Sequence, residues 1–324
     1  MPISPSYFNA HFPFDSEIHS SRADNLWSKM SNIRGFHISA LATLLLSSLL
    51  LKILAQDVCA SSSQPNPIAQ QYPNAPTGTL NATLAILPIP IDTARQLIPS
   101  KYAILENAYR VLLPDFPQGM YPVIMQAGLD HDIQLAAYGI SIPDFQRIGW
   151  SFPFVDLLGD GFSSFTWAPA QMISASMEIA VNGSRDYGTT VYPSTFEPGC
   201  DAYSRLPNGT TTFTGTATDN SVHATLQFAP LDQDCANPFP VAFYQNITNQ
   251  PIFGNGTDCD QQIRLFNSTI NQGDFAPVPV KATIVSNIPP LDASAGVDAF
   301  GMLIDTPFIE YNHVDCQSLK GYHI

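Results

Sequence analysis

The chain is built from short apolar runs that stop at proline, glycine or aspartate. Residues 84–89 read LAILPI, for example, and a further proline and an aspartate follow at positions 90 and 92. The 28 prolines and 19 glycines are scattered rather than repeated, and each proline removes a backbone donor that a helix interior or a central strand requires. This pattern disfavours long helices and predicts a strand-dominated α+β fold.

The first ordered unit of the domain is expected within residues 84–102, LAILPIPIDTARQLIPSKY. A strand over residues 84–89 is predicted to end at the prolines. Asp92 is predicted to cap a two-turn helix, because its carboxylate can accept the free amides of the first turn, and Pro99 ends that helix. The folded domain is therefore expected to begin near Leu80.

A polar leader precedes this unit. Residues 61–79, SSSQPNPIAQQYPNAPTGT, are rich in serine, proline and glutamine, a composition typical of extended, mobile segments. We therefore predict a mobile leader over 61–79 and a single folded domain over 80–324.

Residues 1–60 are set apart from the fold by a targeting signal. Residues 36–55 form a hydrophobic segment, with Arg34 before it and small residues at possible cleavage sites near its end. This arrangement is typical of a secretory signal.

The start of the chain leaves two alternatives open. The polar stretch before Met30 is longer than the start of an ordinary signal peptide, whereas Met30 begins a more typical one. Either translation starts at Met30 and the signal is cleaved, or Met1 is the start and the segment remains as a type II membrane anchor. Both alternatives place residues 61–324 outside the cell or in the lumen of the secretory pathway.

Sequons and cysteines agree with that compartment. The expected glycosylation sites are Asn81, Asn182, Asn208, Asn246, Asn255 and Asn267, each the start of an Asn-x-Ser/Thr sequon. A cut after Ala60 would leave four cysteines, and an even set in an oxidising compartment predicts two disulfides. These cysteines are Cys200, Cys235, Cys259 and Cys316, and the sequence does not choose among their three pairings.

Charge and motifs limit the partners. The formal net charge is −14, which disfavours nucleic acid and anionic membrane surfaces as partners, so a membrane contact is expected only through an uncleaved anchor. We find no Gly-x-Ser-x-Gly elbow, dinucleotide fingerprint, phosphate loop or His-Glu-x-x-His, and predict no cofactor or metal. Glu310 and His313 are disfavoured as a helical metal pair because Pro307 and Cys316 flank them. The oligomeric state stays open.

The order of four segments resembles the acetoacetate decarboxylase superfamily. They are LPIPIDTARQLIPSKY, MYPVIMQAGLDHDI, GDGFSSFTWAPAQMISA and NGSRDYGTTVYPSTFEP, in that order along the chain. The resemblance implies a curved antiparallel sheet or barrel-like core around a central ligand cavity, with a few short helices. It also implies a lysine that forms a Schiff base with a keto acid.

The lysine implied by the resemblance is missing from the matching segment. NGSRDYGTTVYPSTFEP contains no lysine, and GFSSF offers Ser163 and Ser164 where the family has a glutamate. A Schiff-base lysine must be neutral, so an apolar setting is required. Lys281, in VPVKATIVSN, is the one candidate for a buried lysine, and the alternative is a surface lysine that discourages aggregation.

Other polar residues could serve a lysine-independent reaction. Asp130, His131 and Asp132 follow an apolar strand and could act as general acid and base, or form a solvated turn. Arg110 and Arg147 lie in apolar surroundings and could hold a substrate carboxylate, or pair with a structural acid.

Two functions follow from these residues. One is a lysine-independent lyase, dehydratase or cyclase acting on a small carbonyl- or carboxylate-bearing molecule. The other is a non-catalytic binding or carrier protein for such a molecule. The sequence leaves the substrate, the reaction and the existence of catalysis open.

Overall fold

The computed structural model describes residues 61–232, 236–266 and 271–321. These residues belong to one compact unit, Cys59–Ile324. The hydrophobic segment predicted as a signal or anchor, residues 36–55, lies outside them. Within the described part of the chain, every helix is too short or too polar to cross a bilayer.

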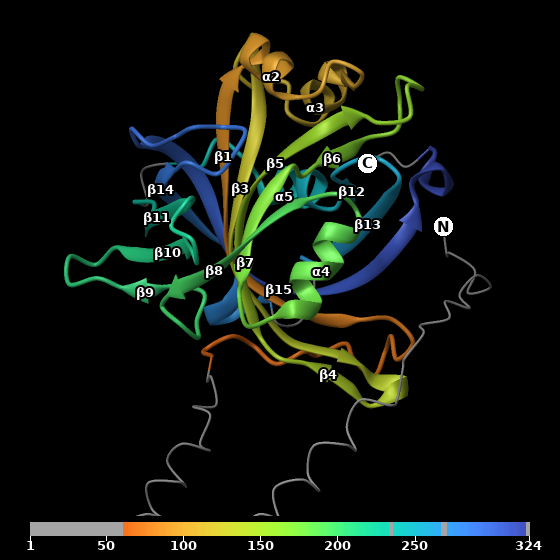
Figure 1. Ribbon diagram of the computed structural model, residues 1–324. Helices are drawn as coiled ribbons and strands as arrows, with labels where there is room; N and C mark the ends of the chain where they lie inside the picture. The colour runs from red at the N-terminus through yellow and green to blue at the C-terminus, as the bar shows by residue number, and fades with distance from the viewer. Residues whose placement is uncertain (1–60, 233–235, 267–270, 322–324) are drawn as a thin grey trace, which may run out of the picture. The chain divides into compact units, whose positions relative to one another are not determined.

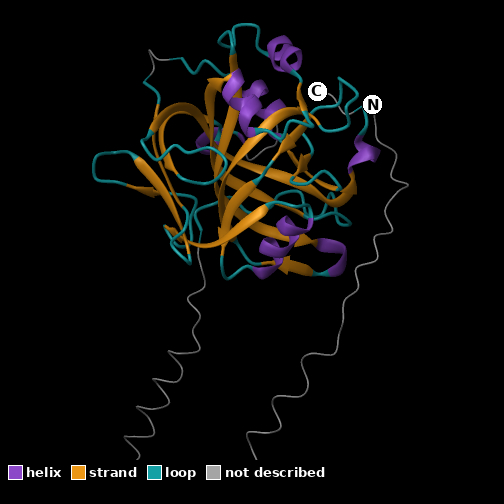
Figure 2. Cartoon of the chain, turned by 45° about the horizontal axis from the view of Figure 1, so that its top comes forward, coloured by secondary structure: helices purple, strands orange, loops and turns teal. Residues whose placement is uncertain are grey.

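Strands supply most of the ordered structure, and the helices are short (Figure 2). The strands are β1 Thr77–Pro90, β2 Ala103–Ile104, β3 Met120–Leu135, β4 Ile140–Ile142, β5 Phe145–Asp156, β6 Phe165–Trp167, β7 Ala170–Ser174, β8 Thr190–Glu197, β9 Ser204–Arg205, β10 Thr211–Ala217, β11 His223–Pro230, β12 Ile252–Phe253, β13 Asp258–Arg264, β14 Val278–Ser286 and β15 Val297–Asp315. The helices are α2 Ile91–Leu97, α3 Glu106–Leu112, α4 Glu178–Asp186 and α5 Val241–Thr248, with 3-10 turns η1 Ala136–Tyr138, η3 Gly273–Phe275 and η4 Cys316–Leu319. The predicted strand-dominated α+β class is confirmed.

Strand pairing closes the sheet into two rings that share a wall (Figure 1). The large ring runs β1, β3, β5, β7, β8, β10, β11, β14 and β15 and returns to β1. The small ring runs β1, β3, β5, β6, β12, β13 and β15. Strands β1, β3, β5 and β15 belong to both and are called the shared wall.

The rings separate because two long strands change partners. Strand β15 pairs with β14 through residues 297–303 and with β13 through residues 308–315. Strand β5 pairs with β7 at residues 147–149 and with β6 near residues 152–155. Each strand therefore starts in one ring and ends in the other.

The two faces of the shared wall differ in character. Successive side chains of a strand point to opposite faces, and directly paired residues share a face. On the large-ring face, Met125 pairs with Trp150 and Ala127 pairs with Ile148, and all four are at most 2% exposed. The interleaved residues of β3 and β5 face the small ring. The large ring thus encloses the apolar core.

The opening unit differs from its prediction at the helix start. Helix α2 begins at Ile91, directly after Pro90, whose backbone is extended. Asp92 was predicted as the N-cap, and this is wrong, since Asp92 already lies in the first turn, where its carboxylate pairs with Arg95 at 2.9 Å.

The leader is packed against the domain. Ile68 and Ala69 are 4% and 5% exposed, and the backbone of residues 62–66 donates hydrogen bonds to side chains of the domain. The prediction of a mobile leader is therefore wrong for residues 61–76. Strand β1 begins at Thr77, slightly before the start near Leu80 that the sequence indicated.

One cystine links the end of β15 to β13. Cys259 and Cys316 form a disulfide with a Cα–Cα distance of 5.2 Å. Cys200 is also disulfide-bonded, and Cys235 lies outside the described residues.

The predicted sequons differ in exposure. Asn182, Asn208 and Asn255 are exposed and Asn246 is half-buried, whereas Asn267 lies outside the described residues. Asn81 is 5% exposed, and its amide donates to Ser63 at 3.0 Å. A glycan at Asn81 does not fit this structure, because β1 is central in the shared wall at that point.

Candidate functional site

A group of polar side chains gathers inside the small ring. We call it the polar cluster. Its members come from β3, β5, β13 and β15 and are Gln126, Asp130, Arg147, Asp260, Gln262, Arg264 and Glu310.

Strand alternation places these residues on one face. Asp260, Gln262 and Arg264 occupy alternate positions of β13, and Gln262 pairs with Glu310 across to β15. Gly128 lies between Gln126 and Asp130 and pairs with Arg147. A Cβ at Gly128 would lie 2.3 Å from the carbonyl oxygen of Asn81, so the close approach of β1 and β3 here requires glycine.

Asp130 and Arg147 form a buried ion pair with one hydrogen bond. The Arg147 Nε lies 2.7 Å from Asp130 Oδ2, and Arg147 Nη2 donates to Asp130 Oδ1 at 3.0 Å. Burial raises the pKa of Asp130, while the Arg147 guanidinium opposes that rise. Burial, the largest single effect, disfavours charged Arg147, but the negative groups around it, Asp130 first, together outweigh burial and the pKa of Arg147 is raised. Two residues predicted from the sequence thus meet, in the acid–arginine pairing that was one of the alternatives.

Gln262 separates two arginines of the cluster. Its Oε1 accepts hydrogen bonds from Nη2 of Arg147 and from Nη2 of Arg264, each at 2.9 Å. Arg264 also donates to the carbonyl oxygen of Thr248. Burial, followed by the charge of Arg147, lowers the pKa of Arg264. The amide oxygen reduces the repulsion between the two guanidinium groups.

Arg264 also sets the orientation of Gln126. Its Nη2 lies 2.6 Å from Gln126 Oε1. A guanidinium can only donate, so the atom that it contacts must be the amide oxygen. The amide nitrogen of Gln126 is thereby left as a donor.

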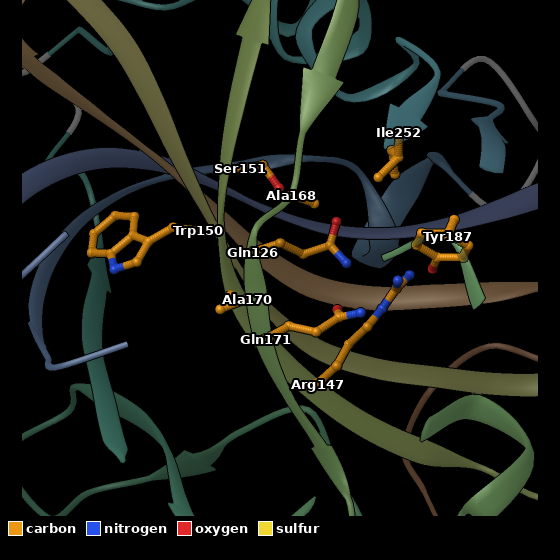
Figure 3. A pocket seen from close by; sticks show the side chains of 10 residues that line it. Gln126, Arg147, Trp150, Ser151, Ala168, Ala170, Gln171, Tyr187 and Ile252 are labelled. Atoms are coloured by element: carbon orange, nitrogen blue, oxygen red, sulfur yellow. The ribbon is translucent and has the colours of Figure 1, made fainter. Parts of the chain in front are cut away.

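A small cavity of about 40 Å³ lies beside Arg147. Figure 3 shows Gln126, Gln171 and Arg147 on one side of the sheet, with Trp150 on the opposite side. The lining residues are Gln126, Arg147, Gly149, Trp150, Ser151, Ala168, Ala170, Gln171, Tyr187 and Ile252.

The cavity is rich in hydrogen-bond donors. Among the described residues, the hydrogen bonds of Arg147 use Nη2, its Nε lies in ion-pair contact with Asp130, and Nη1 makes no recorded contact of either kind. In the same part of the chain, no side-chain hydrogen bond involves Ser151 or Gln171, and none uses the Gln126 amide nitrogen. A cationic group surrounded by neutral donors suits an anionic or carbonyl oxygen.

Asp260 and Glu310 are a pair of acidic side chains near Arg147. Their carboxyl groups are hydrogen-bonded to each other. Burial, followed by the charge of Asp260, raises the pKa of Glu310 well above its usual value. Burial raises the pKa of Asp260 to about 6, against the opposing charge of Arg147. Asp260 is buried and Glu310 half-buried, and two carboxyls that share a hydrogen bond cannot both ionise readily, so the pair retains a proton near neutral pH.

His131 and Asp132 lie away from the polar cluster. His131 follows Asp130 in the strand and therefore points to the other face, where its Nδ1 lies 2.5 Å from Asp144 Oδ2. Asp132 has a left-handed backbone (φ 46°) and accepts the backbone N–H of Asn66 at 2.8 Å. The structure separates the three adjacent candidates into two sites.

Arg110 and Lys281 are also remote from the cavity. Arg110 pairs with Glu106 at 3.0 Å within α3 and donates to the carbonyl oxygen of Phe116. The Lys281 side chain is 57% exposed and pairs with Asp298 at 2.9 Å. Of the two alternatives for Lys281, the structure has the surface lysine, because Val280 and Ala282 point inward and Lys281 points outward.

Several cluster residues were missed by sequence reasoning. Asp260, Gln262 and Arg264 alternate within DCDQQIR, a signal that indicates one polar strand face. Glu310 was considered only as a metal ligand. Among the described residues, no group of three or more histidine, cysteine, aspartate or glutamate side chains is arranged to hold a metal.

Comparison with known proteins gives structural matches only. No protein-family model matches the sequence, and no curated protein matches it. The structure is similar to that of the enduracididine biosynthesis enzyme MppR, at low sequence identity. The complex of MppR with pyruvate has a TM-score of 0.39 and 10% identity, covering 74% of this chain and 88% of MppR.

Two further structures of MppR match similarly. One holds the condensation product of pyruvate and imidazole 4-carboxaldehyde, with a TM-score of 0.37, 10% identity and coverage of 74% and 87%. The other holds HEPES buffer, with a TM-score of 0.37, 10% identity and coverage of 81% and 95%. At this similarity we transfer no residue role from MppR.

Proposed function

We propose that this protein binds a small carboxylate- or carbonyl-bearing molecule in the cavity beside Arg147. The observation that carries the proposal is that Arg147 lines a cavity together with other donors while, among the described residues, its Nη1 makes no hydrogen bond. Asp130 occupies the other edge of the guanidinium and holds it in place. The formal charge of the chain is −14, so a local cationic donor site contrasts with the remainder of the protein.

The cavity limits the ligand to a small molecule. Its volume of about 40 Å³ corresponds to roughly three water molecules. Gln171 and Ser151 are half-buried, so their rotation would enlarge the space modestly. A short oxo acid or carboxylic acid, which replaces those waters and accepts their hydrogen bonds, fits this setting best.

A binding experiment tests the proposal. Pyruvate and acetate serve as anionic probes and acetone as an uncharged one, titrated against the full chain by calorimetry or ligand-observed NMR. Arg147→Gln is expected to weaken anion binding by 10-fold or more, because a charged contact contributes roughly 1.5–3 kcal/mol. Lys281→Gln makes the same change in charge on the surface and is expected to leave binding unchanged.

Two further variants test the cavity without removing a partner of the buried ion pair, in case Arg147→Gln fails to fold. Gln171→Leu and Ser151→Val alter the cavity wall without disturbing the ion pair with Asp130, and both are expected to weaken binding. The proposal fails if the unaltered protein binds none of the probes at about 10 mM, or if Arg147→Gln and Lys281→Gln behave alike.

A lysine-independent lyase, dehydratase or cyclase is the second candidate. It is favoured by the Asp260–Glu310 pair, which holds a proton close to Arg147 and could supply general acid catalysis. No lysine lines the cavity among the described residues, so this chemistry would not use a Schiff base there. Glu310→Gln separates the two candidates. Loss of turnover with ligand affinity retained supports the enzyme, and unchanged turnover contradicts this role.

We also propose that the protein is secreted as a glycoprotein. The Cys259–Cys316 disulfide and the exposed sequons at Asn182, Asn208 and Asn255 support it. Glycosidase treatment of the protein expressed in a eukaryotic secretory host is expected to reduce its mass. Peptide mapping is expected to find Asn81 unmodified. The absence of any mass change would contradict secretion through this route.

A further inference from the structure

One end of the large ring is polar, although the ring interior is apolar. Asn81 pairs with Asp305 in β15 and with Leu129 in β3, and Leu129 pairs with Gln146 in β5. Directly paired residues share a face, so Asn81, Asp305 and Gln146 lie together on the large-ring side. They are 5%, 7% and 4% exposed. We call this polar end the mouth of the large ring.

The leader crosses the mouth as an extended segment. It runs below the sheet in Figure 1, between the undescribed N-terminal part and β1. Three alternate backbone N–H groups donate to carboxylates of β3, of β15 and of the loop between β8 and β9. These bonds join Ser62 to Asp201 at 3.3 Å, Gln64 to Asp305 at 2.9 Å and Asn66 to Asp132 at 2.8 Å.

Short polar side chains complete the contact. The Thr79 hydroxyl donates to the carbonyl oxygen of Gln64 at 2.7 Å, and the Asn81 amide donates to the hydroxyl of Ser63 at 3.0 Å. Asn66 donates to the hydroxyl of Thr77 at 2.9 Å. The segment is held by domain side chains and does not pair as a strand in the sheet.

The mouth has more acceptor capacity than the leader uses. Oδ1 of Asp305 is buried, and it has no hydrogen-bond partner in the described part of the chain. A buried acceptor without a partner is costly, so the site can take a further donor.

We propose that the mouth is a binding groove for extended polypeptide and that residues 61–66 are a detachable strap occupying it. The groove recognises backbone N–H groups at alternate positions, with Ser63 and Pro65 between them. Its resident ligand is the strap itself. This inference does not depend on the ligand proposed for the cavity.

The chain offers a place to release the strap without deleting it. Asn74 is exposed and lies between the strap and β1. A protease recognition sequence inserted after Asn74 in the full chain would allow the peptide bond to be cut after folding. The cut strap is expected to remain bound, and an excess of the synthetic peptide SSSQPNPIAQQYPN, residues 61–74, is expected to replace it.

Backbone recognition makes a sharper prediction for the peptide. Methylation of the Gln64 nitrogen removes the donor to Asp305 and is expected to weaken binding by 10-fold or more, since hydrogen bonds to charged groups are strong. Replacement of Gln64 by Ala leaves the backbone donor in place and is expected to bind within a few-fold of the natural peptide. Equal binding of the methylated and natural peptides would overturn backbone recognition.

Variants of the domain provide the matched control. Asp132→Ala is expected to weaken peptide binding by 10-fold or more, whereas Asp298→Ala, a surface carboxylate paired with Lys281, is expected to have no effect. The proposal is overturned if the peptide fails to bind the cut protein at millimolar concentration while the protein keeps its urea midpoint.

If cutting the chain unfolds the protein, hydrogen exchange on the uncut chain tests the strap instead. The amides of residues 62, 64 and 66 are expected to exchange at least 10-fold more slowly than in the free peptide. Asp132→Ala is expected to remove the protection of residue 66. Exchange as fast as in the free peptide would overturn the strap.

Discussion

The buried pair of Asp130 and Arg147 makes the strongest energetic prediction. Asp130→Asn keeps the shape of the side chain but removes its charge and leaves the Arg147 cation buried. Asp130 is 1% exposed and Arg147 13% exposed as side chains, so solvent offers little compensation. Loss of one partner of a buried ion pair costs about 3–5 kcal/mol.

Polar neighbours reduce that cost towards the lower limit. Gln262 still accepts from Arg147 Nη2 at 2.9 Å, and the new amide oxygen can accept one further hydrogen bond. We therefore expect Asp130→Asn to lower the free energy of unfolding by about 3 kcal/mol. For a domain of this size, that corresponds to a fall in Tm of roughly 6–12 °C.

A double-mutant cycle in urea is the assay. Arg147→Gln and the double variant Asp130→Asn/Arg147→Gln complete the cycle, with the disulfides kept oxidised. The double variant has no buried charge at these two positions, so it is expected to be about 2 kcal/mol more stable than the sum of the single effects predicts. Lys281→Gln breaks an exposed pair and is expected to leave the midpoint unchanged.

Two results would refute the reasoning. A cost below about 1 kcal/mol for Asp130→Asn would mean that the charge of Arg147 is well solvated without its partner. Additive single effects would mean that Asp130 and Arg147 are not coupled.

Three further predictions concern pH, the disulfide and glycine. Burial raises the pKa of Asp305 to about 6, so between about pH 4 and 6 the folded state holds a proton that the unfolded state has released. The free energy of unfolding should therefore fall as pH rises through this range. Asp305→Asn should reduce this fall by up to about 3 kcal/mol, as measured from urea midpoints across the range. A profile unchanged by Asp305→Asn would contradict the assignment. Replacing Cys259 and Cys316 by serine opens a link between residues 57 apart in sequence and should cost about 4 kcal/mol in the chain-entropy model, measured by calorimetry. A fall in Tm no larger than that of a surface variant would argue against this estimate. Gly128→Ala should destabilise the fold by more than about 2 kcal/mol, because its Cβ would overlap the backbone of β1. Gly183→Ala in α4 is the control: its Cβ would meet no atom within 4 Å, so it should stabilise the fold by roughly 0.5–1 kcal/mol. Equal thermal midpoints for the two variants would contradict this contrast.

The strand content of the fold was predictable because it depends on local sequence. Strands β10 and β11 follow residues in which alternate positions are apolar, and Ala224, Leu226 and Phe228 are at most 2% exposed. Proline placement likewise predicted the end of β1. Local patterns do not show which strands pair across the sequence, so the two rings could not be anticipated.

The leader was mispredicted because its stabilisation is tertiary. Residues 61–66 have the composition of a mobile segment, and their order comes from Asp132, Asp201 and Asp305, which lie far away in the sequence. Composition measures what a segment can bury by itself. It does not register acceptors supplied by another part of the chain.

The site was predicted in part for the same reason. Asp130 and Arg147 stood out as charges in apolar strands, and they do meet. His131 and Asp132 were grouped with Asp130 because they are adjacent in sequence, but alternation and a left-handed residue send them elsewhere. Gln262 and Arg264 join the site through the pairing of β13 with β15, which no local pattern reveals.

The shared wall gives the chain a particular freedom to diverge. In β3 and β5, one set of alternate residues fills the apolar core, and the interleaved set faces the cavity and the polar cluster. Substitutions at positions such as 126 and 151 can therefore change what the protein binds while the packing of the large ring stays intact. The shift of a single residue in pairing would instead exchange the two sets and destroy both. Selection can thus act on ligand recognition and on stability through separate, interleaved positions of the same strands.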